Sequence, residues 1–223
     1  MNSVYKHIIF DLDGTLSDSR EGIFNAYYYT FEKLHLKSPD TDRLMSLIGP
    51  PLQKGFADVF GLQGTENETA VKVFREYYSS KGLYENRLYD GIRDLLEKLM
   101  QAGAFLYVAT SKYSVYANQV LNYFGIASYF TEISGADYSG YHASKVDLVA
   151  RILRSNNIID PLEVVIIGDT RYDIDAATEL GIDSVGVTYG FSSLAEIISF
   201  DPDYIIDSVE DLQKLLLIDP VTT

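Results

Sequence analysis

Short apolar runs alternate with helix-like stretches over most of the chain. The clearest runs are Ile8 to Phe10 and Val164 to Ile167, and neither alternates between apolar and polar positions. Such uninterrupted runs are typical of strands buried on both faces of a parallel sheet. Further strands are predicted at 104–109, 130–133, 184–187 and 204–206. Because helical patterns separate these runs, we predict an α/β fold with a doubly wound parallel sheet and right-handed crossovers.

Residues 19–80 depart from this alternation, since they contain helical patterns only. Four apolar stripes recur at helical spacing. They are Ile23-Tyr27-Phe31-Leu34, Leu44-Leu47-Ile48, Leu52-Phe56-Val59 and Ala70-Val73-Phe74-Tyr77. We therefore expect an all-helical module, residues 17–86, inserted after the first strand of an α/β core that comprises residues 1–16 and 87–223.

Composition restricts the partners. The net charge of −14 argues against nucleic-acid polymers and anionic membranes, and an anionic substrate would need a local positive site. No apolar run approaches the roughly 20 residues that span a bilayer, and no secretory signal is visible. The chain has no cysteine, which excludes disulfides and thiol chemistry and fits a cytoplasmic location. The sequence does not indicate an oligomeric state.

The first apolar run ends in two carboxylates, Asp11 and Asp13, followed by Gly14. An Asp-Gly turn is the ordinary explanation of such a pair. Burying a lone carboxylate is costly, however, unless a cation or hydrogen bonds compensate. Gly14 permits the sharp turn that leads the chain away from the strand.

Other polar side chains follow predicted strands in the same way, at the edge where open α/β sheets bind ligands. The four sites are Asp11 with Asp13, Thr110 with Ser111, Asp169 to Asp173, and Lys145 at a helix N-terminus. Taken singly, each site has an ordinary explanation. Thr110 and Ser111 are typical helix caps, Asp169 to Asp173 a charged first helical turn, and Lys145 a surface lysine. Their joint placement at one edge favours a functional site.

Electrostatics indicates what this site would bind. Two like charges about 4 Å apart repel by about 4 kcal/mol at an effective dielectric of 20, so Asp11, Asp169 and Asp173 need a cation to gather. Oxygen ligands without His or Cys favour Mg²⁺, which would also attract an anionic substrate. Lys145 follows Ser144, a predicted N-cap, so its ammonium and the helix N-terminus can face a phosphate.

The motifs resemble those of the haloacid dehalogenase superfamily. Asp-Leu-Asp-Gly-Thr-Leu at 11–16 is similar to the first motif, 108–112 to the second, Lys145 to the third and 167–173 to the fourth. The helical module resembles the family's cap domain. Residues 17–19 and 188–191 match the phosphoglycolate phosphatase-like subgroup, whereas the sequence around Lys145 lacks the Lys-Pro of that subgroup and looks more like relatives described as 5′-nucleotidases.

The resemblance implies a Mg²⁺-dependent phosphomonoesterase that acts on a small metabolite such as phosphoglycolate or a nucleoside 5′-monophosphate. Asp11 would be the nucleophile and form an aspartyl-phosphate, and Asp13 the general acid and base. Asp11, the Asp13 carbonyl and Asp169 would bind the metal, with Asp173 bound through water or behind these ligands. The groups expected to hold the phosphate are Leu12, Asp13, Thr110, Ser111 and Lys145, and those expected to face the site from the module are Gly49, Pro50, Pro51, Leu52 and Lys54.

The residues alone leave other functions open. A sugar phosphomutase would pass the phosphoryl group to a second hydroxyl and release no phosphate. A phosphoacceptor switch of the receiver type shares the Asp, Mg²⁺, Thr and Lys set but requires a lasting phospho-aspartate. A dehalogenase has no use for Asp13 or a metal, and an inactive scaffold has no need of the complete set of catalytic residue types.

Overall fold

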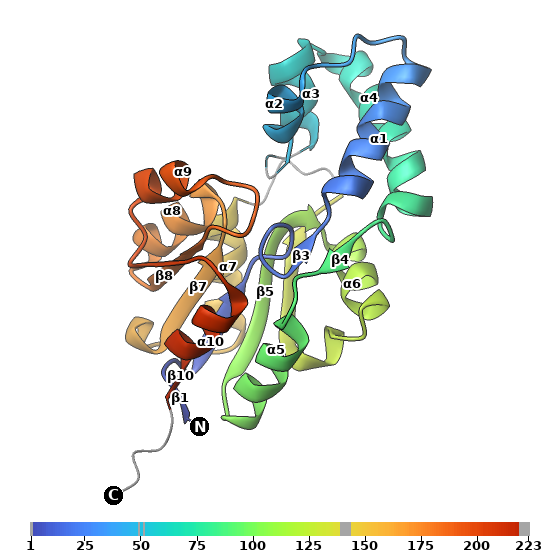
Figure 1. The fold of residues 1–223 in the computed structure, drawn as a ribbon. Coiled ribbons are helices and arrows are strands. Elements are labelled where there is room, and N and C mark those ends of the chain that lie inside the picture. The colour runs from blue at the N-terminus through green and yellow to red at the C-terminus, as the bar shows by residue number, and fades with distance from the viewer. Residues whose placement is uncertain (1, 49, 51, 139–143, 219–223) are drawn as a thin grey trace, which may run out of the picture.

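The computed structural model of the protein describes residues 2–48, 50, 52–138 and 144–218. Its centre is a six-stranded sheet in the order β6-β5-β2-β7-β8-β9 (Figure 1). The strands are β2 (His7–Phe10), β5 (Phe105–Tyr113), β6 (Phe130–Ala136), β7 (Val164–Gly168), β8 (Asp183–Val187) and β9 (Tyr204–Ile206). All neighbouring pairs are parallel, which confirms the predicted parallel sheet.

The two central strands, β2 and β7, are buried along their whole length, which explains their uninterrupted apolar runs. Helices cover both faces. Ile8 and Phe10 belong to a core shared with α5 (Ile92–Gln101), α6 (Ser114–Tyr123) and α10 (Val209–Leu216). Ile9, on the opposite face, packs with α7 (Lys145–Ser155) and α8 (Arg171–Leu180). A further helix, α9 (Leu194–Phe200), contacts α8. The fold is therefore doubly wound.

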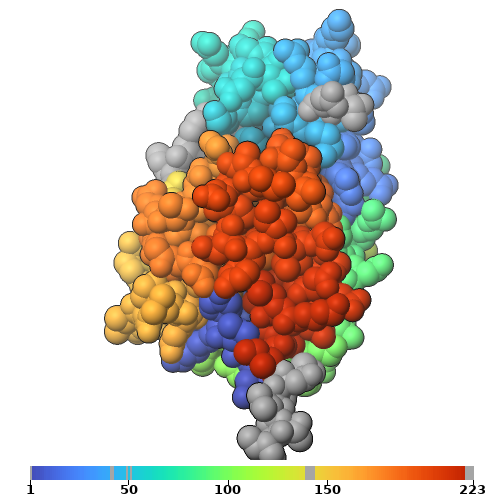
Figure 2. Space-filling view, turned by 60° about the vertical axis from the view of Figure 1, so that its left-hand side comes forward, coloured from blue at the N-terminus to red at the C-terminus, as the bar shows by residue number. Residues whose placement is uncertain are grey.

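Four helices lie above the carboxyl edge of the sheet and form a separate lobe, coloured blue to cyan in Figures 1 and 2. They are α1 (Arg20–Lys33), α2 (Thr41–Met45), α3 (Leu52–Phe60) and α4 (Gly64–Tyr77). We call them the helical insert. Its centre is aromatic: the ring of Tyr27 lies 4.8 Å from that of Phe74 and 5.3 Å from that of Phe56. The apolar stripes predicted from the sequence supply this core.

The chain enters and leaves the insert through two short antiparallel strands, β3 (Ser17–Asp18) and β4 (Arg87–Leu88). Asp18 binds the guanidinium groups of Arg20 and Arg87, at 2.7 and 2.9 Å. The hydrogen bonds from Arg20, opposed by burial, lower the pKa of Asp18 to about 2. Because the two connections pair side by side, we propose the division expected from the sequence, with residues 17–86 as one unit and 1–16 with 87–223 as the other.

Some elements differ from the sequence expectation. Strand β5 continues four residues beyond Ala109, because Thr110 and Tyr113 still pair with β6 across a register shift. Helix α10 was not predicted. The remaining short elements are β1 (Asn2–Ser3), β10 (Leu217–Ile218), and the turns η1 (Tyr78–Gly82), η2 (Ala127–Tyr129) and η3 (Pro161–Glu163). Within the described ranges, every helix is too short or too polar to cross a bilayer.

Candidate active site

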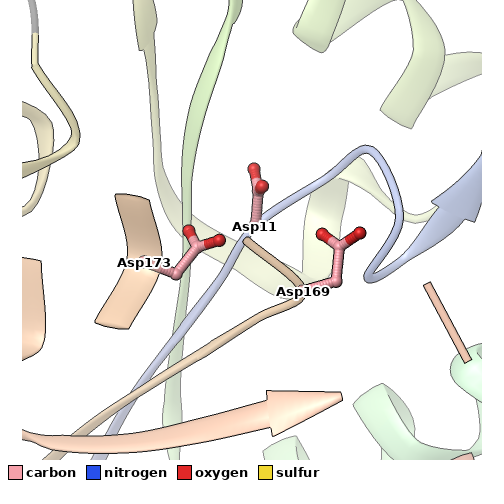
Figure 3. Close-up of side chains that lie close together, drawn as sticks. All are labelled: Asp11, Asp169 and Asp173. Atoms are coloured by element: carbon pink, nitrogen blue, oxygen red, sulfur yellow. The ribbon is translucent and has the colours of Figure 1, made fainter. Parts of the chain in front are cut away.

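Three carboxylates converge at the carboxyl edge of the sheet (Figure 3). Asp11 follows β2, Asp169 follows β7, and Asp173 lies in the first turn of α8. Oxygen atoms of all three lie within 4.8 Å of one another, and all three residues are buried. The register of β2 and β7 explains this convergence. Phe10 pairs with Ile167, so the segments that follow the two strands leave the sheet side by side. The cluster can hold a metal ion.

Glycines make room for these carboxylates. Gly14 has a φ of +88°, and a Cβ atom there would collide with the Asp169 carboxylate. A Cβ atom on Gly168 would likewise collide with Asp173. Asp169 also accepts a hydrogen bond of 2.7 Å from the Phe191 amide. The 188–191 segment, which the sequence analysis assigned only to a subgroup, thus contacts the site directly.

Lys145 connects two of the three carboxylates. Its Nζ atom lies 2.9 Å from Asp11 Oδ1, 2.8 Å from Asp173 Oδ1 and 2.9 Å from the Ala109 carbonyl oxygen. Ser144 is the N-cap of α7, as predicted, and the structure adds that it forms a capping box with Asp147. Lys145 is therefore a buried positive charge at the predicted position.

The charges within the site perturb one another. Burial raises the pKa of Asp11 to about 7, against the opposing effect of Lys145, and the nearby Asp173 and Asp13 add to the rise. Burial, then the charge of Asp11, raises the pKa of Asp169. Burial disfavours the Lys145 ammonium, but Asp11 and Asp173 more than offset it and raise its pKa. Buried carboxylates that resist joint ionisation, with hard oxygen donors, fit a divalent cation.

Asp13, Thr110 and Ser111 line a cavity with Asp11 and Lys145. The Thr110 side chain is buried, and its Oγ1 accepts a hydrogen bond of 3.1 Å from the Lys112 amide. The Leu12 side chain is buried as well, and its amide donates to Asp11 Oδ1 at 2.7 Å. The structure therefore gathers the residues predicted along the sheet edge.

Only part of the insert loop that was predicted to face the site lines the cavity. Pro50 and Leu52 line the cavity. Gly49 and Pro51 lie outside the described residues. Lys54 does not line the cavity, since its exposed side chain forms an ion pair of 2.9 Å with Asp58 on the same helix.

The sequence analysis missed the upper wall of the cavity, which is largely aromatic. The insert contributes Tyr27 and Phe74, β5 contributes Tyr113, and α6 contributes Tyr116. It also missed Lys112, whose Nζ lies 2.7 Å from Asp13 Oδ2. Burial disfavours the charge on Lys112, but Asp13 more than offsets it and raises its pKa. The signals for Lys112 were its place directly after Thr110 and Ser111 and its position as the last residue of the second motif.

Comparison with known proteins assigns the family. A model of haloacid dehalogenase-like hydrolases matches residues 8–187. A 5′-nucleotidase from Pseudomonas aeruginosa is 37% identical over 212 residues, 95% of this chain and 96% of that protein. The tyrosine-protein kinase PtkA of Mycobacterium tuberculosis is 39% identical over 184 residues, 82% of this chain and 62% of that protein. The crystal structure of a predicted phosphatase from Clostridium acetobutylicum has a TM-score of 0.89 at 38% identity, covering 95% of this chain and 98% of that one.

The chain therefore belongs to the haloacid dehalogenase-like hydrolases, as its motifs suggested. Within this family it is a phosphatase, a hydrolase of phosphoric monoesters.

Proposed function

We propose that the protein hydrolyses a small phosphate monoester in two steps, with Asp11 as the nucleophile and Mg²⁺ as the metal. The observation that carries this proposal is the buried cluster of Asp11, Asp169 and Asp173 beside Lys145, in which Asp11 and Lys145 also line a cavity. Asp11, Asp169 and the Asp13 carbonyl would hold the metal, and Asp173 would support them. When bound, Mg²⁺ would neutralise charge on the carboxylates and on the transferring phosphoryl group.

In the first step an Asp11 oxygen forms a bond to phosphorus while the bond from phosphorus to the leaving oxygen breaks. Lys145 and the Leu12 amide hold Asp11 Oδ1 at 2.9 and 2.7 Å, which fixes the orientation of the nucleophile. Asp13 gives its proton to the leaving alkoxide. Thr110 and Ser111, which line the same cavity, would bind the phosphoryl oxygens.

In the second step water attacks the phosphorus of the aspartyl-phosphate. Asp13, now ionised, accepts a proton from that water, the bond between phosphorus and Asp11 breaks, and inorganic phosphate leaves. One carboxyl group thus serves both steps, which distinguishes a phosphatase from a switch that keeps its phosphoryl group.

We propose a nucleoside 5′-monophosphate as the substrate class. The supporting observation is the aromatic and apolar wall above the carboxylates, which includes Tyr27, Phe74, Tyr113 and Tyr116. A flat base can stack on the partly exposed rings of Tyr113 and Tyr116, whereas the charged two-carbon acid of phosphoglycolate is too small to cover them. The relative named as a 5′-nucleotidase agrees with this choice. A cytoplasmic location stays a prediction from the sequence.

The test is phosphate release from nucleoside monophosphates, sugar phosphates and phosphoglycolate, with Mg²⁺ and with a chelator. We expect the highest kcat/KM for a nucleoside monophosphate, and only with the metal. A preference for phosphoglycolate would refute the substrate class. Because one relative is a tyrosine-protein kinase, the assay should also follow where labelled phosphate goes. If labelled phosphate moved to a second hydroxyl or to a protein tyrosine in place of water, the hydrolytic second step would be wrong.

A further inference from the structure

Lys112 is a second buried lysine at the site, and it contacts a different carboxylate from Lys145. Its side chain is only 6% exposed, and its Nζ lies 2.7 Å from Asp13 Oδ2. The same Nζ donates a hydrogen bond of 2.5 Å to the Tyr78 hydroxyl. An ammonium group is costly to bury unless good partners surround it, so this placement requires a reason beyond packing.

Tyr78 fixes Lys112 from the side of the helical insert. It is the first residue of η1, a π-helical turn that continues α4 toward the sheet. Its ring stacks on Phe74, with centroids 5.5 Å apart, and meets the edge of Tyr116 at 5.8 Å. Rings from α4 and α6 therefore pack against Tyr78 on two sides and restrict where its hydroxyl can lie. Single π-helical turns are frequent at functional sites.

The two oxygens of Asp13 are in different environments. Oδ2 pairs with Lys112, whereas Oδ1 is buried and has no hydrogen-bond partner among the described residues. The residue lines the cavity that holds Asp11. Lys112 thus anchors one oxygen of a carboxyl group that lines the same cavity as the nucleophile.

We propose that Lys112 is a positioning residue that holds the Asp13 carboxyl group for proton transfer to the leaving oxygen, and that Tyr78 orients Lys112 from the helical insert. This inference rests on the proposed two-step phosphatase reaction. Lys112 neither gives nor takes a proton. The proton moves from the Asp13 carboxyl group to the leaving alkoxide as the bond from phosphorus to that oxygen breaks.

A leaving-group comparison tests this role. An alkyl phosphate such as glycerol 2-phosphate needs its leaving oxygen protonated, whereas p-nitrophenyl phosphate releases a stable phenolate. We expect Lys112→Met to lower kcat/KM by about 100-fold for the alkyl ester and by less than about fivefold for the aryl ester. The ratio kcat/KM covers steps up to the departure of the alcohol, so breakdown of the phosphoenzyme does not confuse the comparison.

A double-mutant cycle with Asp13→Asn separates positioning from phosphate binding. If Lys112 acts through Asp13, the double variant loses no more activity on the alkyl ester than Asp13→Asn alone. Equal losses on both esters, or losses that multiply in the double variant, would overturn the proposal, since a phosphate-binding lysine would produce them. Wild-type protein that releases phosphate from neither ester and from no nucleoside monophosphate would instead overturn the proposed function, on which this inference rests.

Two further variants keep the test decisive if Lys112→Met folds poorly. Tyr78→Phe removes only the hydroxyl, and we expect a loss of about fivefold confined to the alkyl ester. Lys112→Arg keeps the charge, and we expect it to restore part of the alkyl activity. The matched control is Lys33→Met, because Lys33 pairs with Glu76 at 3.1 Å beside Tyr29 on the exposed surface of the insert. This control should match the wild-type kcat/KM with both esters. If Tyr78→Phe lowered kcat/KM equally for both esters, that result would count against the proposal.

Discussion

The floor and the upper wall of the cavity are built in opposite ways. The floor, which comprises Asp11, Asp13, Asp169, Asp173 and Lys145, lies on the sheet edge and is charged. Polar contacts hold its groups, as Asp11, Asp173 and the Ala109 carbonyl hold Lys145. The wall toward the helical insert is mostly apolar and aromatic, as in the packing of Tyr27 on Phe74, with Gln53 and Arg75 as its polar members. Directional contacts fix atoms for one reaction, whereas apolar surfaces select by size and shape. The floor should therefore determine the chemistry and the wall the substrate.

The largest effect should come from the nucleophile in the floor. Asp11→Asn removes the covalent route, so we expect kcat to fall by about 10³-fold or more with every substrate that the wild type hydrolyses. The measurement is steady-state phosphate release in Mg²⁺. Asp175→Asn is the matched control, since Asp175 is exposed on the same helix as Asp173. Near-normal turnover by Asp11→Asn would show that another group attacks phosphorus.

Metal removal is the second test of the floor. A chelator should lower kcat by about 100-fold or more, because a metal ion contributes several kcal/mol of charge stabilisation, and added Mg²⁺ should restore it. Mg²⁺ should also raise the melting temperature of the wild type by binding the folded state only. That rise should vanish in Asp169→Asn and persist in Asp175→Asn. Full activity in the chelator would rule out a metal in this role.

Much of the floor could be predicted from the sequence because short-range patterns specify it. The buried run at 164–167 marks a central strand, and the Gly168-Asp169 that follows it must then lie at the carboxyl edge. Asp11 follows another such run, and parallel neighbours bring the two carboxylates together. Ser144 marks the start of α7 and so places Lys145.

The upper wall could not be predicted, because no local pattern encodes how the insert lies over the sheet. Tyr78 was not singled out, and its contact with Lys112 joins two elements far apart in sequence. The strand was expected to end at Ala109, with Thr110 and Ser111 as helix caps, yet residues up to Tyr113 extend β5 and carry Lys112 into the site. Two-residue strands such as β3 and β4 are too short to give a periodic signal.

A substitution in the aromatic wall should affect selection more than chemistry. Tyr113 lines the cavity, and its ring meets those of Tyr116 and Tyr138 at 5.1 and 5.3 Å. Tyr113→Ala should lower kcat/KM for a nucleoside monophosphate by about tenfold, which corresponds to the loss of one base–aromatic stacking contact. The kcat/KM for glycerol 2-phosphate should stay almost unchanged. An equal loss with both substrates would mean that the wall supports catalysis and does not select the base.

The smallest effect concerns stability, and it again separates the floor from the rest of the molecule. In the metal-free protein, burial first, opposed by Lys145, raises the pKa of Asp11 to about 7, well above its usual value. The folded state therefore holds a proton that the unfolded state has already lost between about pH 4 and pH 7. Stability from this group is complete below that window and decreases as the pH rises through it. Asp169 acts in the same direction, because burial and the charge of Asp11 raise its pKa too.

We expect the melting temperature of the metal-free wild type to fall by several degrees between about pH 5 and pH 8, because one unit of pKa shift corresponds to about 1.4 kcal/mol. Asp11→Asn should show a smaller fall, and Asp175→Asn the same fall as wild type. Mg²⁺ should reduce the fall in the wild type, since the cation favours the ionised carboxylates. A melting temperature that rises with pH over this range, equally in wild type and Asp11→Asn, would mean that the carboxylates of the floor do not control stability there.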